Sequence, residues 1–263
     1  MRARGDAPRS KWPRHAQPPA LRPLLRVGRR ELLRLKLSVV IPALNAARTL
    51  PECLAGLEGA IDELILVDGC SGDETVAIAR AAGARVVVAP RGRGSQLRAG
   101  GEAAFGDWLL FLHADTRLGL GWRSAVARHL RQHPARPACF RFRLDDPAWQ
   151  ARLIERGVAL RVALFGLPYG DQGLLVPAAL YHRVGGYRCL PLMEDVDLAG
   201  RLGRIHMLEA DALTSAERWR RDGWLRRSAR NLLCLGFYRA GASPERVARL
   251  YAGAESQKAA RVR

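Results

Sequence analysis

Short apolar runs and segments of helical periodicity alternate along the first half of the chain. The run LSVVIPA at 37–43 is rich in β-branched residues and has the length of a buried strand. In the segment that follows, Leu50, Leu54 and Leu57 recur at helical spacing. Both patterns repeat downstream. We therefore expect strands at 37–43, 62–69, 84–90 and 107–115, with helices in 45–59, 73–83, 91–104 and 121–133.

Four strand–helix repeats with short links are typical of an α/β protein with a doubly wound, mostly parallel, Rossmann-like sheet and helices on both faces. Ligands of such sheets bind beyond the carboxyl ends of the strands. The predicted strand ends carry polar residues, namely Asn45, Asp68, Ser71, Asp73, Arg91, Arg93, His113 and Asp115. The pattern predicts that these side chains gather at one edge of the sheet and form a binding site.

The second half of the chain is less regular. The segment ACFRFRL at 138–144 alternates as a half-exposed strand does, and 170–187 reads as a turn, a strand and a short helix. Amphipathic helices are predicted at 149–166, 194–202, 222–241 and from Ser243 onward. We expect this half to form a smaller C-terminal portion.

Composition adds a basic arm to a globular chain. The net charge is +18, and residues 1–36 hold 11 Lys and Arg against two acidic residues, with five prolines. We expect this arm to be disordered, and it either binds anionic partners or reflects a misplaced start. The five cysteines are scattered without a Cys-x-x-Cys pair, which favours reduced thiols and a cytoplasmic protein. No apolar run has the roughly 18 residues of a membrane span.

His113 and Asp115 directly follow the apolar run WLLFL. One interpretation is that Asp115 only starts a turn or caps a helix. The other is a metal and phosphate site, because Mg²⁺ and Mn²⁺ prefer carboxylate and phosphate oxygens.

Five motifs decide between these interpretations when they are taken together. They are LSVVIPALNAARTL, ELILVDGCSGDET, LLFLHADTRL, VGGYRCLPLMEDVDLAGRL and TSAERW. In this order and spacing the chain resembles the family 2 glycosyltransferases, inverting enzymes of the GT-A fold, over about residues 37–220. The resemblance implies transfer of a sugar from a nucleoside-diphosphate-sugar to an acceptor hydroxyl with Mg²⁺ or Mn²⁺. It implies a nucleotide-binding half at 37–118, an acceptor half at 119–220 and C-terminal helices at 221–263.

The resemblance also assigns residues of the donor site. Asp68 corresponds to the acid that contacts the base or ribose, and Pro42 and Asn45 lie where the first loop passes the base. Asp73 is either a ligand or a helix cap. Arg91, in the segment RGRGSQ, is a candidate phosphate ligand or part of a solvated loop.

The catalytic residues follow from the same resemblance. Asp115 takes the metal role, and His113 departs from the family's Asp-x-Asp pattern, so that it contacts ribose, phosphate or metal, or only packs. Asp195 corresponds to the general base, and Glu194 either positions it or favours the helix start.

Further residues are expected on the acceptor and phosphate sides. Arg218 would bind the diphosphate, and Trp219 would stack on the acceptor or close the site. In both cases the alternative is a basic segment with a buried Trp. Asp171 and Gln172 of the GDQG segment would bind acceptor hydroxyls.

Three alternatives remain open at this stage. A sugar nucleotidyltransferase would show a glycine-rich basic loop after the first strand, where this chain has PALNAAR. A basic nucleic-acid-binding protein would show a recognition motif, and none is present, so we expect no nucleic acid partner. The helices at 149–165 and 223–240 are either core-facing or in peripheral contact with an anionic inner membrane surface, which would suit a lipid acceptor rather than a small molecule.

Overall fold

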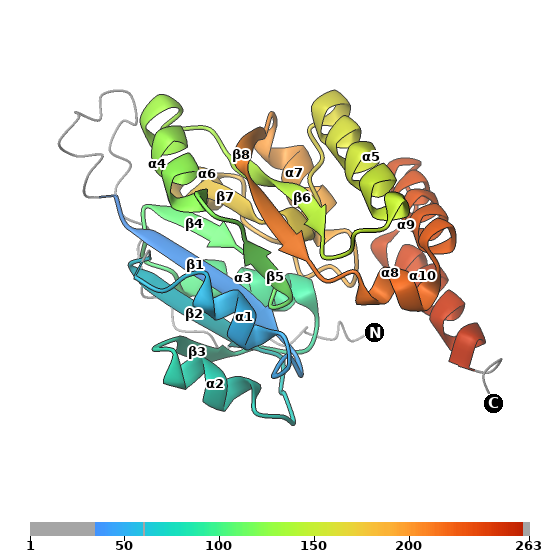
Figure 1. The fold of residues 1–263 in the computed structure, drawn as a ribbon, viewed down its shortest axis with the longest axis horizontal. Coiled ribbons are helices and arrows are strands. Elements are labelled where there is room, and N and C mark those ends of the chain that lie inside the picture. Colours follow the sequence, from blue (N-terminus) through green and yellow to red (C-terminus); the bar gives the residue numbers. More distant parts are fainter. Residues whose placement is uncertain (1–34, 60, 260–263) are drawn as a thin grey trace, which may run out of the picture.

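One mixed sheet organises the molecule (Figure 1). The computed structural model describes residues 35–59 and 61–259, with side chains to residue 252, so the predicted basic arm lies outside it except for Leu35 and Lys36. Across the described residues the strands run in the order β3-β2-β1-β4-β7-β6-β8-β5. Their bounds are β1 Leu37–Ala43, β2 Glu63–Asp68, β3 Arg85–Val88, β4 Trp108–Phe111, β5 Thr116–Leu118, β6 Ala138–Leu144, β7 Leu174–Pro177 and β8 His206–Thr214.

The first four strands confirm the predicted parallel arrangement. β3, β2, β1 and β4 are parallel neighbours, so their carboxyl ends lie at one edge. Beyond β4 the directions mix: β7 is antiparallel to β4 and β6, β8 is parallel to β6, and β5 is antiparallel to β8. The α/β fold class is therefore confirmed, with the irregularity confined to the second half.

Helices cover both faces of this sheet, as Figure 1 shows. Their bounds are α1 Leu50–Ala55, α2 Thr75–Ala81, α3 Arg93–Ala103, α4 Trp122–Gln132, α5 Trp149–Phe165, α6 Ala178–Arg183, α7 Glu194–Leu202, α8 Glu217–Asp222, α9 Trp224–Arg239 and α10 Pro244–Ala259, with a 3₁₀ turn, η2, at Gly170–Gln172. No helix in the described part of the chain is both long enough and apolar enough to span a bilayer.

Alternate residues of β1 enter two different cores. Val39 and Ile41 pack on the face covered by α1, α2 and α4, whereas Val40 packs on the face covered by α3, α6 and α7. All three side chains are fully buried. Burial of a Val or Ile side chain contributes about 1.5–3 kcal/mol, so the β-branched run that predicted this strand also stabilises it.

Helix α3 lies flush against the sheet because its inner face carries glycines. A β-carbon on Gly100 would overlap the side chains of Val40 and Val67, and one on Gly94 would meet the backbone of Arg188 and Leu190. Gly100 thus permits close packing on the sheet and Gly94 close packing on the segment at 188–190. At the carboxyl end of β1, the Gln96 side chain donates to the Ala43 carbonyl at 2.7 Å.

The predicted strand at 107–115 is too long. β4 ends at Phe111, and His113, Ala114 and Asp115 form a turn in which the Thr116 N–H donates to the His113 carbonyl at 3.1 Å. β5 begins directly after this turn and pairs with β8. Asp115 is thus positioned by a turn between two strands and not by the end of one.

Candidate active site

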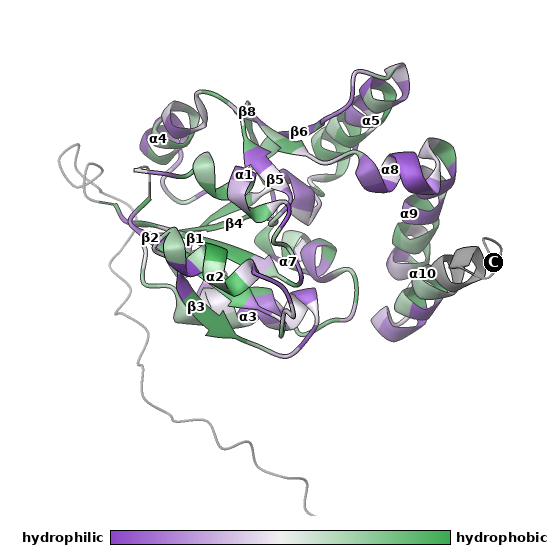
Figure 2. Ribbon diagram, turned by 60° about the horizontal axis from the view of Figure 1, so that its bottom comes forward, coloured by the Kyte–Doolittle hydropathy of each residue, from purple (hydrophilic) through white to green (hydrophobic). Residues whose placement is uncertain are grey.

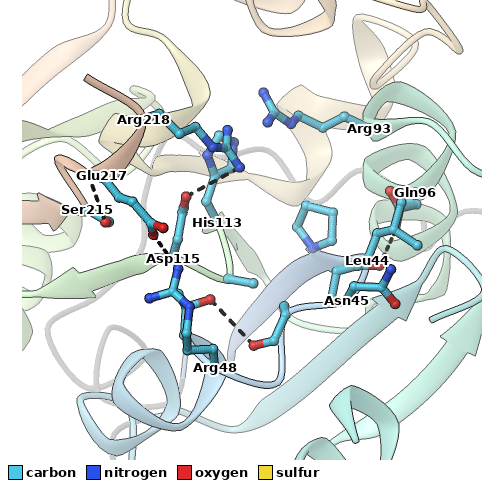
Figure 3. A pocket seen from close by; sticks show the side chains of 15 residues that line it. Leu44, Asn45, Arg48, Arg93, Gln96, His113, Asp115, Ser215, Glu217 and Arg218 are labelled. Carbon is cyan, nitrogen blue, oxygen red and sulfur yellow. Dashed lines mark hydrogen bonds and ion pairs between the residues drawn. The ribbon is translucent and has the colours of Figure 1, made fainter. Parts of the chain in front are cut away.

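A cavity of about 370 Å³ opens at the carboxyl edge of the parallel strands (Figure 3). The loop after β1, from Pro42 to Ala46, forms one side, and His113 and Asp115 form another. The first turn of α3 contributes Arg93 and Gln96. The loop after β8 contributes Ser215, and the first turn of α8 contributes Glu217 and Arg218. A cavity therefore lies at the edge of the sheet where the strand-end pattern predicted a binding site.

A second cavity of about 620 Å³ adjoins the first. It is lined by Tyr169 to Asp171, by the loop at 191–193 and by Glu194 and Asp195 at the start of α7. Side chains of α8, α9 and α10 complete the lining. Arg93, His113, Asp115, Ser215 and Arg218 line both cavities. The two cavities consequently meet at the turn that carries Asp115.

Asp115 lies at this junction opposite an arginine. Its Oδ2 atom is 3.8 Å from Nη2 of Arg218, and both side chains are partly exposed to the cavities (Figure 3). Arg93 points into the same space from α3. The junction thus combines one carboxylate with two guanidinium groups, a set suited to a phosphate-bearing ligand.

The imidazole of His113 is held neutral beside Asp115. Its Nε2 atom is buried and has no hydrogen-bond partner within the described residues. Burial, followed by the positive charge of Arg93, lowers the pKa of His113 to about 3. A neutral imidazole keeps Nε2 available as an acceptor or a ligand.

Glu194 and Asp195 begin α7, after Met193 in the left-handed region with φ of 66°. Asp195 Oδ2 accepts the Gly170 N–H at 2.9 Å, and Oδ1 accepts the Val196 N–H at 2.7 Å. These bonds orient the carboxylate within the second cavity. Left-handed backbone at a non-glycine residue is a strained conformation that is often found at functional sites.

The neighbouring acids are largely shielded from water. Glu194 lies 3.8 Å from Nε of Arg93, and burial together with the charge of Asp195 raises the pKa of Glu194 to about 7. Burial also raises the pKa of Asp171 to about 6. Trp219 stacks on Trp224 with ring centroids 6.3 Å apart and lines the same cavity.

Four residues that the resemblance assigned to the site do not line either cavity, and neither does Ser71 of the strand-end set. Asp68 accepts the N–H groups of Cys70 and Ser71, so its carboxylate stabilises the turn after β2. Arg91 donates to the Cys70 carbonyl at 3.4 Å. Gln172 is fully buried and bonded to Phe140 and Tyr169.

Asp73 is the fourth of these residues, and the structure places it at a helix start. Its carboxylate accepts the N–H of Thr75, the first residue of α2, and the N–H of Ala47 at 3.0 Å. The hydrogen bond from the Thr75 hydroxyl lowers the pKa of Asp73. These contacts correspond to the capping interpretation and also join two loops.

Arg93, which the strand-end pattern included without assigning it a role, lines both cavities. Other lining residues were not identified from the sequence. Tyr169, Asn231 and Tyr251 line the second cavity, the last two from α9 and α10. No motif marked these two helices as part of the site.

Together, the mixed sheet and the two adjoining cavities with acids at their junction have the architecture expected of the GT-A fold class. Residues 38–162 match the family model described as glycosyl transferase family 2, and this part of the chain belongs to that family.

Sequence similarity to individual proteins covers a shorter stretch of the chain than the family model does. The PGL/p-HBAD biosynthesis glycosyltransferase of Mycobacterium bovis (strain BCG / Pasteur 1173P2) is 40% identical over 91 residues, covering 31% of this chain and 36% of the relative. An uncharacterized glycosyltransferase of Rickettsia felis is 36% identical over 84 residues, covering 32% of this chain and 30% of the relative. The match thus spans about a third of the length of these curated relatives.

Solved structures of S. aureus TarS share the fold. The structure of TarS 1-349 has a TM-score of 0.54 at 16% identity and covers 84% of this chain and 71% of that chain. Its complex with UDP-GlcNAc has a TM-score of 0.52 at 18% identity, with coverage of 68% and 59%. This similarity agrees with the predicted GT-A fold class.

Proposed function

We propose that the chain is an inverting glycosyltransferase that moves a sugar from a nucleoside-diphosphate-sugar to an acceptor hydroxyl. The observation that carries this proposal is the position of Asp115 and Asp195, which are 80 residues apart in sequence and line one cavity. The adjoining first cavity has a volume in the range of small-molecule sites. Donor and acceptor would therefore meet at the junction.

The donor is assigned to the first cavity. The loop from Pro42 to Asn45 faces the nucleoside, and Arg93 and Arg218 bind the diphosphate through charge-assisted hydrogen bonds. Asp68 and Asp73 support this side indirectly, since their hydrogen bonds fix the turn after β2 and its contact with the loop after β1. In this proposal residues 37–118 form the nucleotide-binding half.

The residues at the junction fit a divalent cation. Asp115 offers carboxylate oxygens to the cavity, and the unpartnered Nε2 of His113 lies beside it. With donor phosphate oxygens and water, one carboxylate completes the oxygen-rich shell that Mg²⁺ and Mn²⁺ prefer. Bound there, the cation would neutralise charge on the departing diphosphate.

The acceptor is assigned to the second cavity, where Asp195 is the general base. Asp195 takes the proton of the acceptor hydroxyl as its oxygen bonds to the anomeric carbon, while the bond from that carbon to the diphosphate oxygen breaks on the opposite side. The products are the inverted glycoside and the nucleoside diphosphate. The buried hydroxyl of Tyr169, which has no partner in the described part of the chain, and the carboxyl of Asp171 are available to acceptor hydroxyls.

The test is release of nucleoside diphosphate from UDP- and GDP-sugars in the presence of Mn²⁺ and hydroxyl acceptors. Asp195→Asn and Asp115→Asn should each lower kcat by a factor on the order of 100 or more, because loss of a general base costs about 10²–10⁴ in rate. Asp145→Asn removes an exposed carboxylate that lines neither cavity and serves as the matched control. Full activity in Asp195→Asn, or release of pyrophosphate from nucleoside triphosphates, would contradict the proposal.

We further propose that a face made by α5 and α9 contacts an anionic membrane, which would bring a lipid acceptor to the cytoplasmic surface. The two helices contact each other and carry large apolar side chains in solvent, among them Leu160, Leu164, Leu232, Leu233 and Phe237. Exposed arginines accompany them at 156, 226 and 239. In Figure 2 both hydrophilic and hydrophobic residues appear along α9, the pattern of a helix that lies at an interface.

A further inference from the structure

Three histidines gather at the edge of the sheet opposite the proposed active site. His129 lies in the last turn of α4, His133 is the C-cap residue that follows this helix, and His206 begins β8, whose far end leads to the two cavities. The three ring centroids are 5.1–5.3 Å apart. One ligand nitrogen from each ring lies within 4.8 Å of the other two.

His129 is oriented in the way a metal ligand requires. Its side chain is 2% exposed, and Nε2 lies 2.8 Å from the Arg136 carbonyl oxygen, to which it donates. Nδ1 then carries the lone pair, is buried, and has no hydrogen-bond partner among the described residues. Metal-bound histidines regularly donate their second ring N–H to a backbone carbonyl in this manner.

We propose that His129, His133 and His206 bind a transition-metal dication, with Zn²⁺ as the preferred ion. Imidazole nitrogens suit Zn²⁺, whereas Mg²⁺ and Mn²⁺ prefer oxygen ligands, so this cluster selects a different cation from the acid-lined junction. Three histidines leave a fourth position for water. The site does not depend on the proposed transferase activity.

The local environment permits this binding. Nitrogens bound tetrahedrally at 2.0–2.1 Å from Zn²⁺ lie about 3.3 Å apart, so the rings must move closer together. His133 and His206 are only half-buried and have room to turn.

Both positive and negative side chains surround the cluster. A bound ion would cross-link two elements of the fold. Arg136 faces His129 and His206 and opposes a cation, whereas Glu209 faces His206 and favours one. The ion would tie the last turn of α4 to the start of β8. It would thereby strengthen the edge of the sheet that is remote from both cavities.

The experiment is a titration of the EDTA-treated full chain with Zn²⁺, in which calorimetry measures the heat of binding and the number of ions bound. An Asp115→Asn background weakens metal binding at the junction. We expect His133→Ala and His206→Ala each to bind one Zn²⁺ per chain fewer than His182→Ala, a matched control at an exposed histidine of α6. Zn²⁺ should raise the Tm of the control but not of the two cluster variants, and excess Mg²⁺ should not compete.

Co²⁺ gives a second readout, because tetrahedral Co²⁺ absorbs visible light through d–d transitions. The band should appear in the His182→Ala control and be lost in both cluster variants. His133 and His206 are partly exposed, so these variants are expected to fold even if replacement of buried His129 unfolds the chain. Equal Zn²⁺ stoichiometry in the control and in both cluster variants would overturn the proposal.

Discussion

Gly170 sets the relation between two residues of the proposed catalytic centre. Its N–H orients the Asp195 carboxylate, and its missing side chain makes room for the imidazole of His113. A β-carbon on Gly170 would lie 2.6 Å from Nε2 of His113, closer than real contacts allow. Glycine at position 170, the first of the GDQG segment, is thus explained by the close approach of its backbone to the His113 ring and not only by the turn that it forms.

Gly170→Ala should therefore lower transfer activity at least about tenfold and destabilise the fold by about 1–3 kcal/mol, as overpacking of buried sites does. Nucleoside diphosphate release and urea unfolding measure the two effects. Gly157→Ala on α5, where an added β-carbon meets open space, is the control and should keep both at wild-type values or better. Wild-type kinetics in Gly170→Ala would mean that His113 and Asp195 tolerate displacement.

Glu194 makes stability depend on pH. Its pKa is raised in the folded state, so the folded chain holds a proton that the unfolded chain releases between about pH 4.5 and pH 7. Stability should consequently fall as pH rises through this window, by on the order of 1–3 kcal/mol. Urea unfolding of Glu194→Gln at pH 5 and pH 8 should show a smaller fall than the wild type.

Glu102→Gln, at an exposed carboxylate on α3, should retain the wild-type pH dependence of stability. If Glu194→Gln and Glu102→Gln give the same slope, Glu194 is not the group responsible.

The sequence located the junction residues but not all of their neighbours. Asp115, Asp195 and Arg218 were predicted from motifs, and the structure brings them around one cavity. Asp68 and Gln172 were equally polar and equally near strand ends or turns. Yet Asp68 bonds to the backbone of its own turn, and buried Gln172 bonds to the backbone of Tyr169 and Phe140. Residue type and spacing do not reveal whether a strand-end side chain faces its own turn or the cavity.

At the level of elements, regular alternation predicted the parallel half well, and β8 was missed. The sequence of β8, HMLEADALT, contains alanines and acids that are depleted in strands, although its residues alternate between buried and more exposed positions. β5 has only three residues, too few for a period to be visible. Both strands gain stability from long-range pairing, which no local pattern encodes.

The α5 and α9 face gives a prediction at this scale. Leu233→Asp and Phe237→Asp should reduce flotation of the chain with phosphatidylglycerol vesicles several-fold, since each removes an apolar contact and adds a repelled charge. Leu120→Asp replaces an exposed leucine outside both helices and should leave flotation unchanged. Equal flotation of all three variants would exclude this face as the contact.

For the whole molecule, donor binding should appear as stabilisation that needs a cation. A nucleoside diphosphate at 100 times its Kd adds about 2.7 kcal/mol to stability. We expect UDP or GDP to raise the Tm of the wild type in the presence of Mn²⁺, and to raise it less after EDTA treatment. In Asp115→Asn, Mn²⁺ should add nothing to the rise in Tm that the nucleotide causes. A full rise without any cation would show that the arginines alone bind the diphosphate.

The residues that line both cavities have a consequence for the order in which substrates bind. A molecule seated in the first cavity contacts Arg93, Asp115 and Arg218, and so becomes part of the surface that the second cavity presents. The acceptor site would then be complete only after the donor has bound. The nucleoside diphosphate product would dissociate last. Such an enzyme binds its substrates in a compulsory order, donor first. The nucleoside diphosphate product then inhibits competitively against the donor and not against the acceptor alcohol.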